Sequence, residues 1–377
     1  MGTQNFKSRS NIFRIITVCM MVICMISGTV LFDGTVYGSS FGRKTPFSHT
    51  GRSTYYHNGR FSKSFIVNGV DISDWQSKRC NFAKAKNAGV DFAIMKVSGT
   101  YYGRKKLSCY KDSNFSYQYR NAKANSVMVG VYVFSQARNA SEGQREARFA
   151  INRLKALGIK PKDLHLPVYM DYEFAGGRFG RMYGLKRKDA TAAAVAFCNT
   201  IRSAGYTPGI YANTSFFNSY INTKVLAPDV DIWCAQYYKC CKSGTAYTKW
   251  QYTSTARING MLHYLGYRGN IDANYWYINR TVNPEPITSI YGRTTLSLKA
   301  AKSPKFRIYY GNTLLKEGKD YVVGGIRNNR KGKAYAYIKG IGRYGGYALV
   351  PFTVANRNSG SDKTALNGVS ANYLTRS

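Results

Sequence analysis

The stretch Leu166-Pro-Val-Tyr-Met-Asp-Tyr-Glu173 is the most informative part of the sequence, because it is a short apolar run that ends in two carboxylates. A run of this length and composition is typical of a buried strand. Side chains at positions i and i+2 of a strand point the same way, so Asp171 and Glu173 should share a face, about 6 to 7 Å apart along the backbone. In a partly desolvated cleft, the charge on one disfavours charge on the other, and one carboxyl can stay protonated as a general acid. The alternative is a pair of solvated charges at a strand end.

Seven more strands are predicted around this stretch, with helical patterns between the earlier ones. The eight predicted strands are 67–72, 92–97, 127–134, 166–173, 208–211, 231–236, 249–253 and a segment ending at Asp272. The clearest helical stretches are 141–157 and 189–204. Strands that alternate with helices predict an α/β fold, here an irregular TIM-like β/α barrel with eight strands and fewer helices.

Two other predicted strands also carry an acid at their ends. Asp71 lies in Asn68-Gly-Val-Asp-Ile-Ser73, and Asp272 follows Gly269-Asn-Ile. The first and last strands of a barrel are neighbours by closure, and the catalytic groups of such barrels lie at the carboxyl ends of strands. Three acidic strand ends in a chain with 18 acidic residues predict a single acidic cleft, which joins Asp71 and Asp272 to the first pair.

Aromatic side chains near these strand ends are candidates for stacking against a sugar. We predict that substrate binding involves Tyr132, Tyr211, Trp233 and Tyr237, and core packing is the alternative for each. Histidine is scarce, at four in the chain, and no CxxC pair occurs, so we expect no metal site and no cofactor.

Four motifs occur in order along the chain: Gly69-Val-Asp-Ile-Ser-Asp-Trp-Gln76, Ala88-Gly-Val-Asp-Phe-Ala93, Asp171-Tyr-Glu173 and Trp250-Gln-Tyr252. Together they resemble the glycoside hydrolase family 25 lysozymes over residues 67–280. The resemblance implies an N-acetylmuramidase that cuts the β-1,4 bond between N-acetylmuramic acid and N-acetylglucosamine.

On the same resemblance, Glu173 is the proton donor, Asp171 lies beside it, and Asp71 and Asp272 complete the acidic cleft. The resemblance also implies retention of the anomeric configuration, with the substrate's acetamido group as nucleophile and Asp171 in an orienting and charge-stabilising role. One departure is Val97-Ser-Gly-Thr100, where the family often reads Thr-Glu-Gly. Two alternative hypotheses of function are a glycan-binding protein without catalytic activity and a chitinase-like glycosidase.

The two ends of the chain predict export and an accessory domain. Three basic residues precede an uncharged run at 15–32, so residues 1–40 are expected to be a signal peptide or an uncleaved membrane anchor. We expect linkers at 41–66 and 281–286, a small all-β sandwich at 287–355 and a polar tail at 356–377. The sandwich segment resembles a β-sandwich repeat of secreted bacterial surface proteins.

The formal net charge of +37 predicts a polyanionic partner. Nucleic acid and the anionic polymers of a bacterial wall fit this charge equally well, but the export signal favours the wall, and no nucleic-acid-binding motif is recognised. We therefore expect a monomer, secreted or associated with the wall or membrane on its outer side, whose partners are peptidoglycan glycan strands and anionic wall polymers. Six cysteines outside the apolar run can pair in an oxidising exterior, although their spacing fixes no connectivity.

Overall fold

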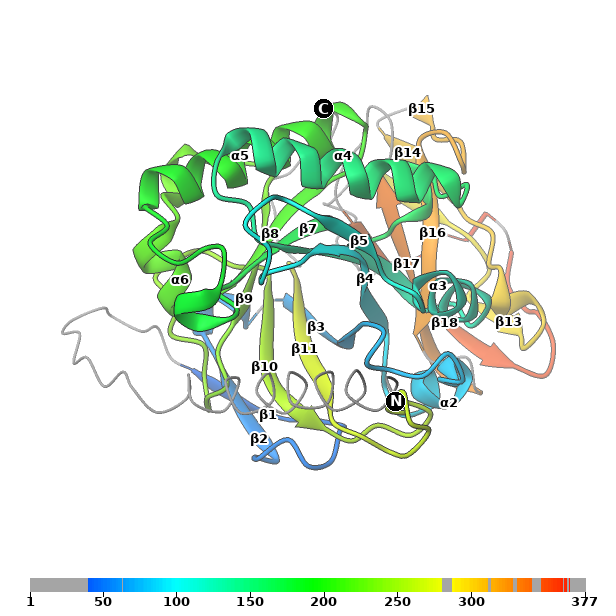
Figure 1. The fold of residues 1–377 in the computed structure, drawn as a ribbon. Helices are drawn as coiled ribbons and strands as arrows, with labels where there is room; N and C mark the ends of the chain where they lie inside the picture. The colour runs from blue at the N-terminus through cyan, green and yellow to red at the C-terminus, as the bar shows by residue number, and fades with distance from the viewer. Residues whose placement is uncertain are drawn as a thin grey trace, which may run out of the picture.

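Eight strands form a closed barrel, because β3 (Ser64–Ile72) pairs with β4 (Phe92–Thr100) on one side and with β11 (Ile271–Asn279) on the other (Figure 1). The computed structural model describes residues 40–62, 64–279, 287–310, 313–327, 331–340, 347–361, 363–364 and 366, so residues 1–39 of the expected export segment and the 281–286 linker lie outside it. The barrel strands are β3 (Ser64–Ile72), β4 (Phe92–Thr100), β6 (Met128–Ser135), β7 (Val168–Tyr172), β8 (Pro208–Asn213), β9 (Asp231–Ala235), β10 (Lys249–Ala256) and β11 (Ile271–Asn279). The predicted eight-stranded barrel is confirmed, and a short strand, β5 (Cys109–Lys111), extends it beside β4.

The eighth strand runs opposite to the predicted direction. We expected a strand that ends at Asp272, whereas β11 begins at Ile271 and runs antiparallel to both β3 and β10. An apolar pattern locates a strand but says nothing about its direction. Because β11 is reversed, its start lies where the parallel strands end, and Asp272 pairs in register with Asp71. Asp71 and Asp272 therefore lie side by side as predicted, but they do so because β11 begins beside the end of β3, and not because it ends there.

Five α-helices in the described part of the chain pack around the barrel (Figure 1). They are α2 (Phe82–Asn87), α3 (Phe115–Ala124), α4 (Ala140–Ala156), α5 (Arg187–Ser203) and α6 (Thr214–Tyr220), and the 3₁₀ turns are η1 (Gly59–Phe61), η2 (Pro161–Asp163), η3 (Gly177–Phe179), η4 (Thr223–Val225) and η5 (Ala300–Lys302). The side chain of Asn139 caps α4 by accepting from the backbone N–H of Glu142. Helices α4 and α5 approach so closely at Gly143 that a Cβ there would lie 2.3 Å from the carbonyl oxygen of Ala193.

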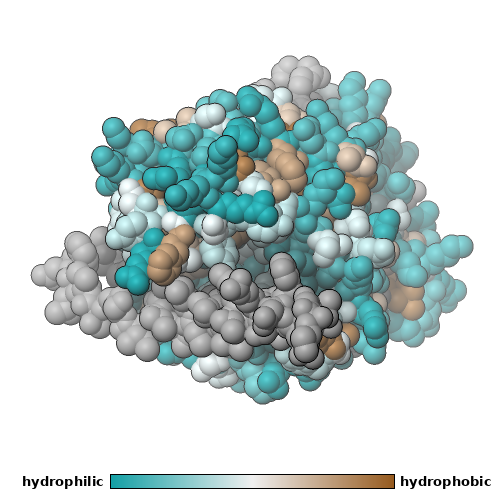
Figure 2. Space-filling view, viewed as in Figure 1, coloured by the Kyte–Doolittle hydropathy of each residue, from teal (hydrophilic) through white to brown (hydrophobic). Residues whose placement is uncertain are grey.

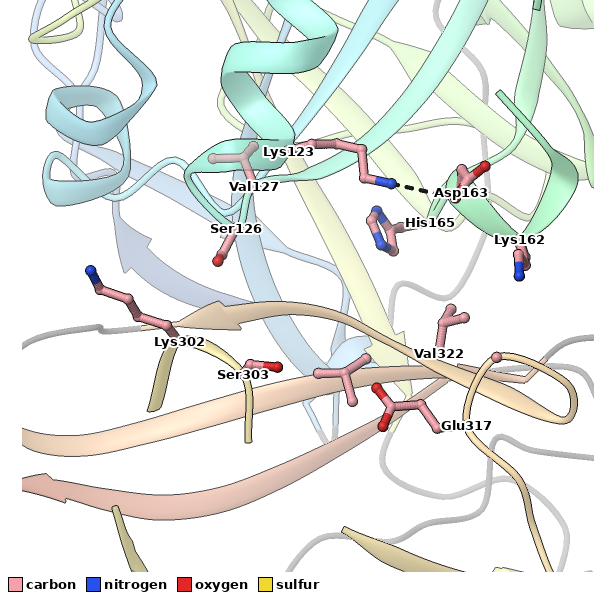
Figure 3. Close-up of a pocket in the computed structure, with 12 residues that line it drawn as sticks. Lys123, Ser126, Val127, Lys162, Asp163, His165, Lys302, Ser303, Glu317 and Val322 are labelled. Atoms are coloured by element: carbon pink, nitrogen blue, oxygen red, sulfur yellow. Dashed lines mark hydrogen bonds and ion pairs between the residues drawn. The ribbon is translucent and has the colours of Figure 1, made fainter. Parts of the chain in front are cut away.

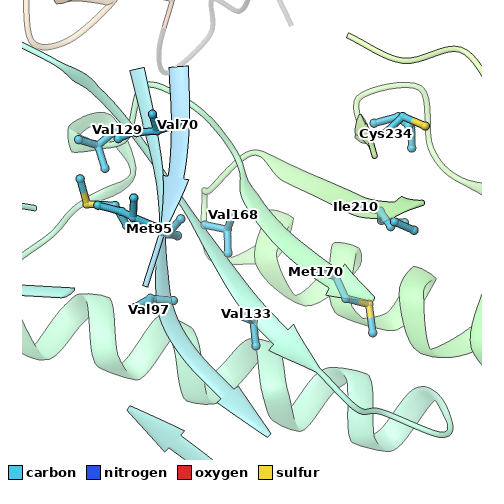
Figure 4. Close-up of a cluster of buried hydrophobic side chains, with 14 of the residues drawn as sticks. Val70, Met95, Val97, Val129, Val133, Val168, Met170, Ile210 and Cys234 are labelled. Carbon is cyan, nitrogen blue, oxygen red and sulfur yellow. The ribbon is translucent and has the colours of Figure 1, made fainter. Parts of the chain in front are cut away.

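The barrel has an inner and an outer core, as the alternation of strand β7 shows. Val168, Met170 and Tyr172 join the cluster between the strands and the helices, part of which appears in Figure 4. Tyr169 points the other way, into a separate cluster inside the barrel with Trp233. Side chains at alternate positions of β7 therefore face the barrel interior, and Asp171 lies on that inward face.

The segment expected as an N-terminal linker is ordered over most of its length. Strands β1 (Phe41–Lys44) and β2 (Thr54–His57) form an antiparallel hairpin. Tyr55 is buried, with its ring 5.7 Å from that of Trp250, and His57 Nδ1 lies 2.8 Å from the hydroxyl of Tyr277. A few buried aromatic rings anchor this Gly- and Ser-rich segment to the barrel, which its composition alone does not reveal.

Two sheets form the predicted sandwich after the barrel. One contains β12 (Ile287–Tyr291), β14 (Arg307–Tyr310) and β15 (Thr313–Leu314), and the other contains β13 (Thr295–Ser297), β18 (Tyr347–Ala355), β17 (Gly332–Gly340) and β16 (Tyr321–Arg327). Part of the expected polar tail also belongs to this domain, because the backbone N–H of Leu366 donates to the carbonyl of Ile290 at 2.9 Å. Residues 367–377 lie outside the described part of the chain.

The sandwich covers one end of the barrel, the floor, where the parallel strands begin. Tyr337 and Leu349 pack in one apolar cluster with Phe92 and Leu166, which lie at that end. The ammonium of Lys339 donates to the carbonyl of Leu164 at 2.7 Å. Beside this contact lies a cavity of about 290 Å³, lined from the barrel by Lys123, Lys162, Asp163 and His165 and from the sandwich by Lys302 and Glu317 (Figure 3). The described residues of the sandwich do not cover the opposite end of the barrel, which we call the mouth.

Of the helices that the structure describes, none combines the length and the apolar character needed to cross a membrane.

Candidate active site

The mouth gathers the four acids that the sequence singles out. Asp71 and Asp171 lie at the ends of β3 and β7 and are buried, with 6% and 7% of their surface exposed. Glu173 follows directly after β7 and Asp272 opens β11, and both are half-buried. Asp171 interacts electrostatically with each of the other three carboxyls, so the structure brings the predicted residues into one cluster.

Asp71 lies at the centre of this cluster and is held by two amides. Its Oδ2 accepts hydrogen bonds from Gln251 Nε2 at 2.9 Å and from Asn274 Nδ2 at 2.8 Å. The side chain of Asp272 also hydrogen-bonds to Asp71. Since a bond between two carboxyls requires a proton, Asp71 and Asp272 share a proton when this bond is formed.

Three of the predicted sugar-binding aromatics support the amides. Gln251 Oε1 accepts from the hydroxyls of Tyr211 at 2.7 Å and Tyr237 at 2.9 Å, and Asn274 Oδ1 accepts from the indole N–H of Trp233 at 2.8 Å. We expected Trp233 to contact a sugar. In the structure it is 1% exposed and packs inside the barrel, out of direct reach of a sugar. It orients Asn274 instead.

The remaining aromatics differ in exposure. Tyr211 is also buried, at 7% exposed, whereas Tyr237 is 43% exposed and stays available at the mouth. Tyr132 is half-buried, with its ring 6.4 Å from that of Trp233. The four predicted residues therefore divide into an inner support, Tyr211 and Trp233, and two side chains with exposed surface, Tyr132 and Tyr237.

Burial raises the pKa of every acid in the cluster. Burial, followed by the charge of Asp71, raises the pKa of Glu173 to about 7. Burial also raises the pKa of Asp71 to about 6, although the hydrogen bonds from Asn274 and Gln251 act in the opposite direction. The pKa values of Asp171 and Asp272 are raised well above their usual range, again chiefly by burial. Because these groups titrate together, the cluster retains protons near neutral pH.

Lys96 is a functional candidate that our sequence reasoning missed. Its ammonium lies 2.7 Å from Asp74 Oδ1 and 3.5 Å from Asp112 Oδ2, and its charge lowers the pKa of Asp171 against the effect of burial. The signal was a lone lysine within the apolar strand Ile94-Met-Lys-Val97. This cation borders the mouth just before Val97-Ser-Gly-Thr100, the segment that departs from the family pattern.

A buried network behind Glu173 was also missed. The side-chain amide of Gln136 donates to the main-chain oxygen of Glu173 at 2.9 Å, while its backbone N–H donates to Glu146 at 3.0 Å. Glu146 also accepts from the hydroxyls of Thr100 at 2.6 Å and Ser135 at 2.5 Å. Burial raises the pKa of Glu146 to about 7. The signal in the sequence was an acid on the apolar face of α4.

The six cysteines outside the N-terminal run are free thiols in this structure, so the pairing that we allowed for is not seen: Cys80, Cys109, Cys198, Cys234, Cys240 and Cys241. Within the described ranges, no group of three or more His, Cys, Asp or Glu side chains is arranged to hold a metal ion.

Comparison with known proteins gives two similar lysozymes. Lysozyme M1 of Streptomyces globisporus is 29% identical over 220 residues, which cover 55% of this chain and 67% of that protein. The lysozyme of Lactococcus phage mv1 is 25% identical over 182 residues, which cover 47% of this chain and 82% of that protein.

Among solved structures, the modular autolysin LytC from Streptococcus pneumoniae, in complex with a synthetic peptidoglycan ligand, is 21% identical with a TM-score of 0.45. The match covers 56% of this chain and 47% of LytC, so this chain spans about half the length of that autolysin. The family model for glycosyl hydrolases family 25 matches residues 70–261, about half of the 377 residues, and includes Asp71, Asp171 and Glu173. The chain belongs to glycosyl hydrolases family 25.

Proposed function

We propose that this glycoside hydrolase is a lysozyme that cleaves peptidoglycan at the β-1,4 bond between N-acetylmuramic acid and N-acetylglucosamine, with Glu173 as general acid. The observation that carries the proposal is the pKa of Glu173, which burial and the charge of Asp71 raise to about 7 at the barrel mouth. A general acid works best with a pKa near the operating pH, because it must hold its proton and still release it. The two similar lysozymes support the choice of substrate.

In the first step, Glu173 transfers its proton to the glycosidic oxygen as the bond from that oxygen to C1 breaks. The carbonyl oxygen of the substrate's own acetamido group then bonds to C1 and takes up the positive charge. Asp171 orients and stabilises this acetamido group. Its Oδ1 suits the role because it is buried and makes no hydrogen bond within the described residues.

In the second step, water attacks C1 and releases the acetamido group, while the carboxylate of Glu173 takes the proton from the water. Asp71 raises the proton affinity of Glu173 in the first step through its negative charge. Gln251 and Asn274 hold that charge in place by donating to Asp71 Oδ2, and the side chain of Asp272 shares a hydrogen bond with it.

The test is Glu173→Gln, which keeps the shape of the side chain but removes the transferable proton. We expect the variant to fold normally and to lose cleavage of purified peptidoglycan. The matched control is Glu317→Gln in the sandwich, the same substitution on an acid paired with Lys305 far from the mouth. Near-normal turnover by the Glu173 variant would refute the assignment. Products of the unaltered protein that carry a reducing end other than N-acetylmuramic acid would refute the bond specificity.

We further propose that the protein is exported by its N-terminal segment and works as a monomer held on anionic wall polymers. The support is the net charge of +37 and a surface dominated by hydrophilic residues over α4 and α5 (Figure 2). Arg145, Arg148 and Lys155 are exposed along α4. The sandwich serves as an accessory, wall-proximal module, and its position on the barrel floor leaves the mouth accessible to a glycan strand.

A further inference from the structure

An aromatic platform lies on the two loops beside Asp71 and Asp272. It consists of Trp75, on the loop after β3, and His263, Tyr264 and Tyr267, on the loop before β11. The ring of Trp75 is 5.7 Å from that of Tyr264 and 6.2 Å from that of His263. Tyr267 stacks on His263 with the ring centroids 4.6 Å apart and the planes 25° apart. The four rings form one continuous surface.

The main chain fixes the platform. The backbone N–H of Tyr264 donates to the carbonyl of Trp75 at 2.7 Å, and that of Ser77 donates to the carbonyl of Leu262 at 2.8 Å. Within the second loop, the N–H of His263 donates to the carbonyl of Tyr267 at 2.8 Å. The platform is therefore rigid before any ligand binds, which lowers the entropic cost of using it.

The platform is continuous with the acidic mouth. Trp75 follows Asp71 by four residues and Tyr267 precedes Asp272 by five, and the strands that carry the two acids are hydrogen-bonded neighbours. Glu173 directly follows β7, and β7 is not hydrogen-bonded to either of these strands. A polymer that crosses the mouth from β7 toward β3 and β11 would leave it over the platform.

The rings are exposed to a degree that packing does not explain. Trp75 is 38% exposed, whereas the other three tryptophans are at most 3% exposed, and Tyr267 is 55% exposed. Large exposed apolar groups that lie together on a protein surface mark binding sites. Flat, exposed aromatic rings suit the apolar faces of pyranose sugars.

We propose that the platform is a glycan subsite, which binds an N-acetylated pyranose of the same strand at a distance from the bond that is cut. This inference rests on the proposed function, because it takes the occupant of the mouth to be a polysaccharide. The subsite adds binding energy for long strands and touches no reacting atom. It therefore makes long strands better substrates than short fragments.

The exposure of Trp75 supplies a direct binding assay. In the Glu173→Gln background, where strands bind without being cut, we expect peptide-free peptidoglycan glycan strands to protect tryptophan fluorescence from quenching by acrylamide. Trp75→Phe keeps an aromatic ring but should lose this protection, because the other three tryptophans are already buried. Trp75→Ala and Tyr267→Ala should each weaken the binding of long strands about tenfold, which corresponds to about 1.4 kcal/mol.

In the otherwise unaltered enzyme, the two alanine variants should raise KM for long strands at unchanged kcat, and should cleave short fragments normally. The matched control is Tyr309→Ala, which removes a half-buried ring paired with Tyr291 in the sandwich and should change neither measurement. Long strands that bind without protecting Trp75, or that bind both alanine variants as tightly as the parent, would overturn the subsite, as would the absence of binding. The proposed function fails by a different result, continued cleavage by Glu173→Gln.

Discussion

Replacing Asp71 by asparagine should lower the pKa of Glu173. Two causes raise this pKa from its ordinary value of 4.5 to about 7, first burial and second the negative charge of Asp71. Asparagine removes the charge but keeps an oxygen that can accept from Gln251 and Asn274, so burial should persist while the electrostatic contribution disappears. Because burial is the larger cause, Asp71 accounts for less than half of the rise. The expected decrease is at most about one pH unit, or about 1.4 kcal/mol of interaction between the two groups.

The alkaline limb of the rate profile reports the loss of the proton from the general acid. In the parent, activity should fall as the pH rises through about 7, and in Asp71→Asn the fall should begin at a lower pH. The profile of kcat/KM on soluble glycan fragments measures this shift. The variant should also be much less active, so a second measurement is an NMR titration of the ¹³C-labelled glutamate carboxyls, with the Glu173 signal assigned by its absence in Glu173→Gln. An unchanged or higher pKa of Glu173 in the variant would refute the electrostatic coupling.

Three other results are expected. Asp272→Asn should cut activity strongly, and the variant should lose less stability than the parent between pH 4 and pH 7, because a carboxyl with a raised folded-state pKa stabilises the fold only while protonated. Thermal melts at both pH values test this expectation, and an equal loss of stability in parent and variant would contradict it. Gln136→Leu should lower kcat more than it changes KM, because it removes the 2.9 Å hydrogen bond to the main chain of Glu173, and it should lower the free energy of unfolding by about 1 kcal/mol. An unchanged kcat in steady-state kinetics would rule out a positioning role for Gln136. Adsorption of the enzyme to whole walls should fall with added salt and after the anionic polymers are stripped, whereas cleavage of short soluble fragments should change little, because exposed charges are screened over about 8 Å at physiological ionic strength. If neither treatment changes adsorption, the enzyme must be held on the wall by specific contacts instead.

Much of the barrel was predictable because its strands are short apolar runs with acids at their ends. The stretch that ends at Glu173 predicted strand β7, and alternation placed Asp171 on its inward face. Closure of the barrel predicted that Asp71 and Asp272 meet, and they pair in register. The direction of β11 was not predictable, because an alternating or apolar pattern reads the same from either end.

The supporting residues of the site were harder to find because their function depends on partners distant in the sequence. Gln251 and Asn274 are ordinary polar residues until the fold places both against Asp71. Trp233 was assigned to the cleft by its residue type, but the barrel interior buries it and uses its N–H. Lys96 and Glu146 carried a detectable signal, since each is a charged residue within an apolar pattern. Such positions predict burial with partners more often than solvent exposure.

Buried charges have different neighbours at the two ends of the barrel: an opposite charge at the floor and like charges at the mouth. At the floor, the ammonium of Lys249 is matched by Asp231, whose carboxylate oxygens lie 2.9 and 3.0 Å away and also accept from the hydroxyl of Tyr169. At the mouth, Asp171 has Glu173 and Asp71 as like-charged neighbours, and each raises its pKa. A buried charge with an opposite partner can be neutral for stability, whereas like charges in one buried cluster destabilise the fold unless protons remain bound. The mouth therefore retains an arrangement that stability alone would not favour, and this arrangement supports the proton donation that we propose for Glu173.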